Sequence, residues 1–145
     1  MTAYSTLTAA LLDPDGTIDP TTINRLRRGL RTWLLAGGTL PLPRCLGLPA
    51  TPGQMRRALR DVHLARAAAL LDDGTTWQRA KALDRRARHF LAYRWPAWFS
   101  LREPPADANL MDAELWHATK AAGGRLPGSP QALRVILEKH FPVES

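Results

Sequence analysis

The segment TWQRAKALDRRARHFLAYR, residues 76–94, decides the fold class because its apolar and basic residues separate at helical spacing. Apolar residues recur every three or four positions, which places them on one side of a helix. They are Trp77, Ala80, Leu83, Ala87, Phe90 and Leu91. Basic residues occupy the opposite half: Lys81, Arg85, Arg86, Arg88 and His89. Thr75 or Thr76 is a suitable N-cap. The pattern predicts a helix with one buried face and one basic face.

Two more long amphipathic helices are expected before this segment. Asp19 as N-cap and Pro20 at the first helical position start one helix, which ends at Ala36 before a glycine pair. A capping box at 51–54 starts the other, which should reach about Leu71. The apolar faces contain Ile23, Leu26, Leu30, Trp33 and Leu34 in the first helix and Met55, Leu59, Val62, Ala69 and Leu70 in the second.

Proline-rich segments separate the predicted helices. Residues 39–50 contain three prolines and should form an extended, partly buried connection. Residues 94–99, RWPAWF, should close the third long helix with an aromatic knot, and 103–109 should form a turn. Two shorter helices are expected, one over residues 109–122 and one that starts at 129–130.

These elements predict an all-α fold, a compact bundle of about five helices. Three long amphipathic helices and two short C-terminal ones follow a short irregular or extended N-terminal segment. The chain of 145 residues has the length of one domain. We expect that domain to span 1–145, with a basic three-helix part at 19–102 and a smaller C-terminal helical part at 107–141.

The composition limits the compartment and the cofactors. Cys45 is the only cysteine, which excludes a disulfide within the chain and a multi-thiolate metal site. The four histidines lack a close i, i+4 pair, so we expect surface or core roles for them and neither a metal nor a cofactor. The N-terminus lacks the basic region of a secretion signal, and no apolar run approaches the ~20 residues that cross a bilayer. A cytoplasmic protein without membrane contact is expected.

The distribution of charge points to a polyanion partner. Residues 25–94 hold fifteen Arg and Lys against four Asp, a net charge of +11 (15 minus 4) in a chain of net charge +7. Such a surface attracts nucleic acid in a salt-sensitive way. We therefore predict a non-enzymatic protein that contacts the phosphate backbone of DNA or RNA, alone or as a small subunit of a nucleoprotein complex. The expected contacts are Arg28, Arg31, Arg56, Arg60, Lys81, Arg85, Arg86, Arg88, His89 and Arg94.

Other interpretations of the same residues stay open. The helical hairpin at 55–94 could be a helix-turn-helix or an ordinary hairpin with solvated cations. The protein could also be an interaction module that docks its basic surface on an acidic partner protein. Trp95 and Trp98 would then form a hot spot, whereas on nucleic acid they would stack on bases. Arg66 projects into the apolar stripe of its helix, so we expect it either to pair with a carboxylate, for which Asp84 is the first candidate, or to reach solvent by snorkelling.

The string AALLDPDGTID, residues 9–19, resembles the first motif of haloacid-dehalogenase-type phosphatases. The resemblance implies that Asp13 is a phosphoryl-accepting nucleophile, that Asp15 is the general acid/base, and that carboxylates hold Mg²⁺. The later chain lacks the strand-borne residues that this family needs. A type I turn at 13–16 that leads into the helix at 19 is therefore the preferred interpretation.

Overall fold

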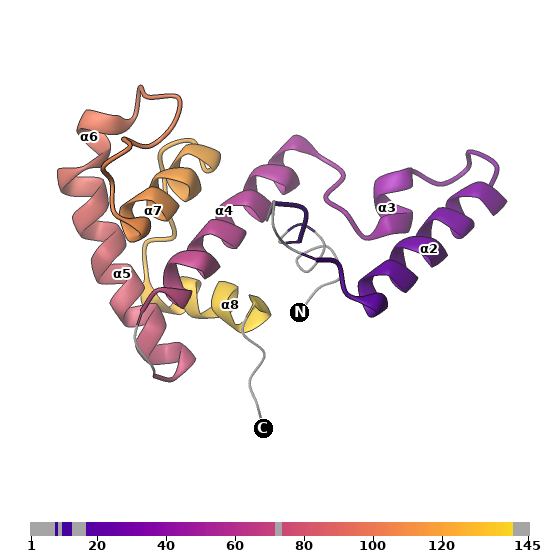
Figure 1. Cartoon of the computed structure of the whole chain (residues 1–145), viewed down its shortest axis with the longest axis horizontal. Helices are drawn as coiled ribbons and strands as arrows, with labels where there is room; N and C mark the ends of the chain where they lie inside the picture. Colours follow the sequence, from indigo (N-terminus) through magenta and orange to yellow (C-terminus); the bar gives the residue numbers. More distant parts are fainter. Residues whose placement is uncertain (1–7, 9, 13–16, 72–73, 141–145) are drawn as a thin grey trace. The chain divides into compact units, whose positions relative to one another are not determined.

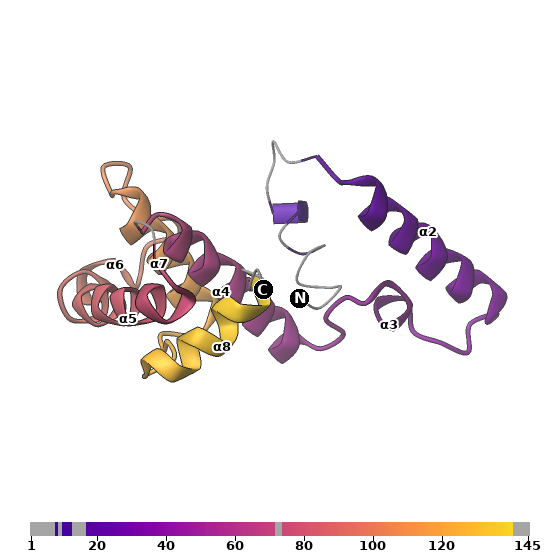
Figure 2. The ribbon, with the colours of Figure 1, turned by 90° about the horizontal axis from the view of Figure 1, so that it is seen from below.

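Helices form all of the regular secondary structure in the residues that the structure describes, 8, 10–12, 17–71 and 74–140. The structure is a computed structural model. Its elements are α2 (Pro20–Leu35), α3 (Leu42–Leu46), α4 (Pro52–Ala69), α5 (Thr76–Tyr93), α6 (Trp95–Trp98), α7 (Leu110–Ala121) and α8 (Pro130–His140) (Figures 1 and 2). No strand occurs in these residues, so the predicted all-α class is confirmed. Residues 8 and 10–12 are helical, which differs from the irregular or extended segment expected there.

The predicted number of about five helices is not confirmed, because α3 and α6 are additional short helices. Helix α3 lies inside the segment that was expected to be extended. Pro41 precedes it and Pro43 lies in its first turn, where a missing backbone N–H costs no hydrogen bond. Gly47 ends it in the left-handed conformation, with φ of 67°. Prolines prevent a helix only in its interior, and these two lie at its start.

The chain divides into two compact units, residues 1–58 and 59–145. The boundary falls within α4, so residues of this one helix belong to both units. The expected single domain over 1–145 stays a prediction.

In the first unit, α2 begins as predicted and packs on α3. The backbone N–H of Thr22 donates to Asp19 Oδ1 at 2.7 Å, which caps the helix. Gly29 is buried against α3. A Cβ atom at Gly29 would overlap the carbonyl oxygen of Cys45 and lie 3.0 Å from the Leu46 side chain. The close approach of the two helices therefore requires glycine at this position.

The apolar face of α2 is only partly covered. Leu26 and Trp33 are half-buried, but Ile23, Leu30 and Leu34 are 42%, 43% and 69% exposed. Helix α3 contacts the side of α2 on which Gly29 lies, about one third of a turn away from these three residues. An exposed apolar stripe consequently runs along the basic helix α2.

The second unit has the main hydrophobic core, which α4, α5, α7 and α8 share. Its buried residues are Leu64, Ala65, Ala67 and Ala68 from α4, Ala80, Leu83, Ala87 and Phe90 from α5, Met111, Leu115, Trp116 and Ala118 from α7, and Leu133, Ile136 and Leu137 from α8. Trp77 and Leu91 pack against it in half-buried positions. The predicted inner face of α5 is therefore correct. Thr75 and Gln78 form the capping box at its start.

The buried face of α4 differs from the predicted stripe. Val62 is buried as expected, but Met55 and Leu70 are exposed and the alanines at 65, 67 and 68 are buried. Arg66 is half-buried and lies among residues of the outer side. The alanine-rich sequence of this helix gave little contrast between its faces, which is why the stripe was misplaced.

A polar cluster connects α4 with α7. His63 Nδ1 donates to Glu114 Oε2 at 2.7 Å, and the His63 ring stacks on His117 at 4.8 Å between ring centres. The edge of Trp116 contacts the His117 ring at 5.1 Å. Burial lowers the pKa of His117, the neighbouring His63 and Arg66 side chains lower this pKa further, and Glu114 opposes the shift. Protonation of His117 is therefore disfavoured in the folded protein.

The contact at Gly29 predicts the effect of a single methyl group. Gly29→Ala should destabilise the packing of α3 on α2 by about 1–3 kcal/mol, because the methyl group displaces backbone and not a mobile side chain. Amide exchange of Cys45, whose N–H donates to Pro41 O at 3.2 Å, measures this local stability. Gly53→Ala is the matched control, since no atom lies within 4 Å of that Cβ position. Equal protection of Cys45 in both variants would contradict the prediction.

The His117 environment predicts a pH dependence of stability. The folded-state pKa lies below the ordinary value of 6.5, so the unfolded chain binds this proton more readily. The contribution of His117 to the free energy of unfolding should be fully present above pH 6.5 and be lost as the pH drops below that value. Denaturant unfolding at a series of pH values should show a weaker decline in His117→Gln. His89→Gln, an exposed position on α5, should keep the wild-type profile. A His117→Gln profile parallel to wild type would refute this assignment.

Candidate nucleic-acid interface

The outer face of α5 is fixed by the burial of its inner face. With Leu83, Ala87 and Phe90 fully inside the core, the helical period turns the residues between them outward. The exposed basic residues of this helix and its end are Lys81, Arg85, Arg86, Arg88, His89 and Arg94. All six belong to the predicted phosphate contacts.

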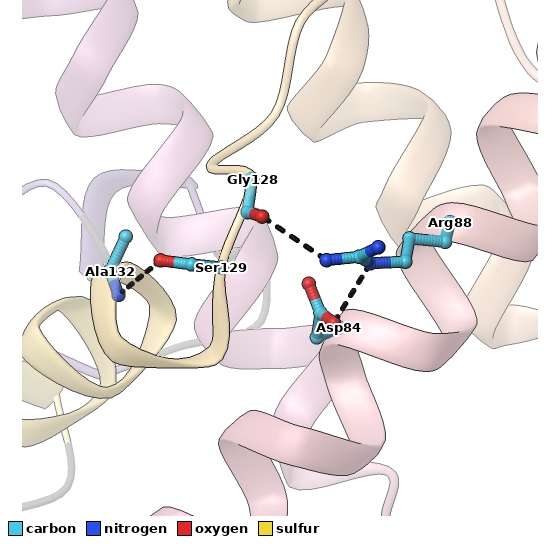
Figure 3. A network of polar contacts seen from close by, with 5 residues as sticks. All are labelled: Asp84, Arg88, Gly128, Ser129 and Ala132. Carbon is cyan, nitrogen blue, oxygen red and sulfur yellow. Dashed lines mark hydrogen bonds and ion pairs between the residues drawn. The ribbon is translucent and has the colours of Figure 1, made fainter.

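Arg88 is already engaged within the second unit. Its Nε donates to Asp84 Oδ2 at 2.9 Å, and its Nη2 donates to the carbonyl oxygen of Gly128 at 3.3 Å (Figure 3). The next residue, Ser129, accepts a hydrogen bond from Ala132 N at the start of α8. Arg88 thus connects α5 to the loop that leads into α8.

The partner of Asp84 differs from the one expected. Asp84 is buried, with 7% of its surface exposed, and a buried carboxylate requires a partner. The sequence suggested Arg66, but Arg88 holds this position from one turn further along the same helix. The expected pairing of Arg66 with Asp84 was therefore wrong.

Two more predicted contacts have acidic partners. Arg60 pairs with its neighbour Asp61 at 2.8 Å. Arg94 lies 3.6 Å from a carboxylate oxygen of Asp112 and 5.9 Å from the ring centre of Trp98. These pairs reduce the positive potential at Arg60 and Arg94, as Asp84 does at Arg88. Their contact with phosphate stays a prediction.

Lys81, Arg85 and Arg86 form the part of the α5 face that lacks acidic partners in the described chain. Lys81 lies 5.6 Å from the ring centre of Trp77, a cation–π contact that leaves its charge exposed. His89 packs beside Tyr93, with ring centres 4.7 Å apart. We refer to Lys81, Arg85 and Arg86 as the α5 cation cluster.

The remaining predicted contacts, Arg28, Arg31 and Arg56, lie in the first unit and are exposed. The described part of this unit contains the arginines Arg25, Arg27, Arg28, Arg31, Arg44, Arg56 and Arg57 and a single acid, Asp19. Hydrogen bonds from Thr22 lower the pKa of Asp19, and the Arg25 charge adds to this effect. The carboxylate of Asp19 is committed to the helix cap.

A groove between α2 and α3 brings together cations that the sequence did not single out as a group. It has a volume of about 320 Å³, and its basic lining residues are Arg25, Arg28 and Arg44. Only Arg28 was among the predicted contacts. The spacing of Arg25 and Arg28 on one helix could have indicated that pair. Arg44 gave no signal, because its segment was expected to be extended.

Trp95 and Trp98, the predicted hot spot or stacking platform, are half-buried. Their ring centres lie 6.2 and 6.0 Å from that of Phe90, and both rings pack against the core of the second unit. Trp98 also accepts a hydrogen bond at its carbonyl oxygen from Trp116 Nε1 at 3.0 Å. These rings therefore stabilise the fold of this unit. The exposed aromatic residues nearby are Tyr93 and Phe99.

The structure leaves the phosphatase-like resemblance without a test, since Asp13 and Asp15 lie outside the described residues. Among the residues that are described, no group of three His, Cys, Asp or Glu side chains could hold a metal ion. Cys45 is half-buried.

None of the helices between residues 17 and 140, leaving aside 72–73, has the length and apolar character needed to span a membrane.

Comparison of the chain with protein families, with curated proteins and with solved structures found no match.

Proposed function

We propose that this protein is a non-enzymatic nucleic-acid-binding protein that contacts the phosphate backbone of DNA or RNA. The α5 cation cluster carries the proposal, because three cations share one exposed helix face and have no acidic partner in the described chain. The exposed arginines of α2, including Arg28 and Arg31, would add contacts. The protein would act in the cytoplasm, alone or as a small subunit of a nucleoprotein complex.

Physical chemistry supports backbone contact over base reading. Guanidinium groups bind phosphate oxygens in bidentate geometry, and each phosphate that they neutralise releases condensed counterions. The core behind α5 fixes the backbone from which the cluster projects, so binding has to order only the side chains. We infer binding that depends strongly on salt and weakly on sequence.

A second candidate function is that of an interaction module for an acidic protein. The exposed stripe of Ile23, Leu30 and Leu34 on α2 favours it, since this stripe lies beside Arg27 and Arg31. An amphipathic acidic helix would match both properties. Retention of a protein, and of no nucleic acid, from extracts of the native host would favour this candidate over the first.

Charge reversal in the α5 cation cluster tests the first proposal. Lys81→Glu combined with Arg85→Glu should weaken binding to generic DNA or RNA roughly 10- to 100-fold at about 0.1 M salt. The slope of the logarithm of the binding constant against the logarithm of salt concentration should decrease by about 2. Fluorescence anisotropy with labelled single- and double-stranded DNA and RNA measures both quantities.

The control for this double variant carries the same charge change elsewhere in the second unit. Arg102→Glu combined with Arg125→Glu alters two exposed arginines outside α5. It should keep most of the affinity, and circular dichroism should show equal helicity in all three proteins. Equal losses in both double variants, or wild-type binding that does not change with salt, would overturn the proposal.

A further inference from the structure

The groove between α2 and α3 is an open depression of the surface with an unbalanced charge. Its volume is about 320 Å³, and the side chains that line it include Arg25, Arg28, Thr32 and Arg44. It lies entirely within the first unit. Arg25 and Arg28 come from α2, whereas Arg44 comes from α3.

Gly29 makes this arrangement possible. Because Gly29 lacks a side chain, the backbone of α3 at Cys45 lies directly against α2. The same contact brings Arg44, the residue before Cys45, to the groove that Arg25 and Arg28 line. The positions of the three arginines are therefore set by a helix–helix contact and not by a loop.

No acidic residue lines the groove, and none of its three arginines has an ion pair with a described residue. Asp19, the acid of this unit that the structure describes, caps α2 through Thr22. Three like charges around one groove repel each other unless an anion lies between them. Guanidinium groups suit the oxygens of a phosphate, which accept two parallel hydrogen bonds from each group.

We propose that the α2–α3 groove binds a phosphomonoester, that is, a terminal phosphate group. A monoester carries a charge of roughly −1.5 to −2 near neutral pH, whereas a backbone diester carries a single negative charge. Three guanidinium groups match the larger charge better. This site is separate from the α5 cation cluster, and phosphate binding in the groove does not require that cluster. The monoester can belong to a free nucleotide or to the end of a nucleic-acid strand.

Nuclear magnetic resonance titration tests the site directly. Inorganic phosphate and a nucleoside monophosphate should shift the backbone signals of Gly29, Thr32 and Gly47 and the Nε–Hε signals of the lining arginines, and the shifts should saturate. The parent nucleoside, and chloride at matched ionic strength, should not produce saturable shifts. Shifts of similar size at every exposed arginine would indicate general screening and would overturn the proposal.

Single substitutions locate the binding. Arg44→Gln and Arg25→Gln should each raise the phosphate concentration for half-saturation by about tenfold or more. Arg57→Gln removes an exposed arginine of the same unit that does not line the groove, so it should bind like wild type. Unchanged affinity in both Arg44→Gln and Arg25→Gln would refute the site.

Two further arms identify the source of the phosphate and separate this site from the proposed nucleic-acid surface. A short oligonucleotide with a 5′-phosphate that binds more tightly than its 5′-hydroxyl counterpart assigns the groove to strand ends. Equal affinity for the phosphorylated oligonucleotide and the free nucleotide assigns it to small phosphorylated molecules. Phosphate binding should persist in Lys81→Glu with Arg85→Glu, so the two proposals can fail independently.

Discussion

Burial of one face of α5 is the constraint on which the second unit depends. Leu83 and Phe90 are fully buried, and they pack with residues of α4, α7 and α8 in one core. These two residues lie two turns apart on the same face, and a helix with one face held in a core along its length cannot rotate about its axis. The outward positions of Lys81, Arg85 and Arg86 therefore follow from apolar packing on the opposite face of the helix. A surface obtained in this way is preorganised for a ligand.

At Asp84, a buried charge determines the role of a residue on the surface. A charge at this position would be costly without a partner, and Arg88 supplies one from the next turn of the helix. The same guanidinium also reaches the Gly128 carbonyl oxygen before α8. Arg88 was a predicted phosphate contact, but its guanidinium instead holds α5 against the loop before α8. Arg94 is a similar case because its partner Asp112 lies in α7, whereas Arg60 pairs with its chain neighbour Asp61 within α4.

The sequence predicted helices where side chains differ strongly along the helical period or where caps are distinct. Asp19 marks the start of α2 and Thr75 that of α5, and the core face of α5 was correct residue by residue. The face of α4 was not, because its alanines have no contrast in size or polarity that marks a side. Helix α3 was missed because its prolines fall at the one place in a helix that tolerates them.

The candidate sites were predictable to a smaller extent. Local periodicity was sufficient to place Lys81, Arg85 and Arg86 on one face. Contacts between distant residues could not be predicted from the sequence. The pairs Arg94–Asp112 and His63–Glu114 form only because helices pack against each other. The convergence of Arg44 with Arg25 and Arg28 depends on the contact at Gly29 and has no signature in local sequence.

The continuity of α4 across the boundary at residues 58 and 59 limits how the chain can be divided. A cut at that boundary would sever the helical hydrogen-bond ladder in mid-helix and leave backbone donors and acceptors without partners on both fragments. A cut between Gly47 and Thr51, outside any helix, would leave this ladder whole and keep all of α4 with the second unit. The two units are thus distinct in their internal contacts but share one helix.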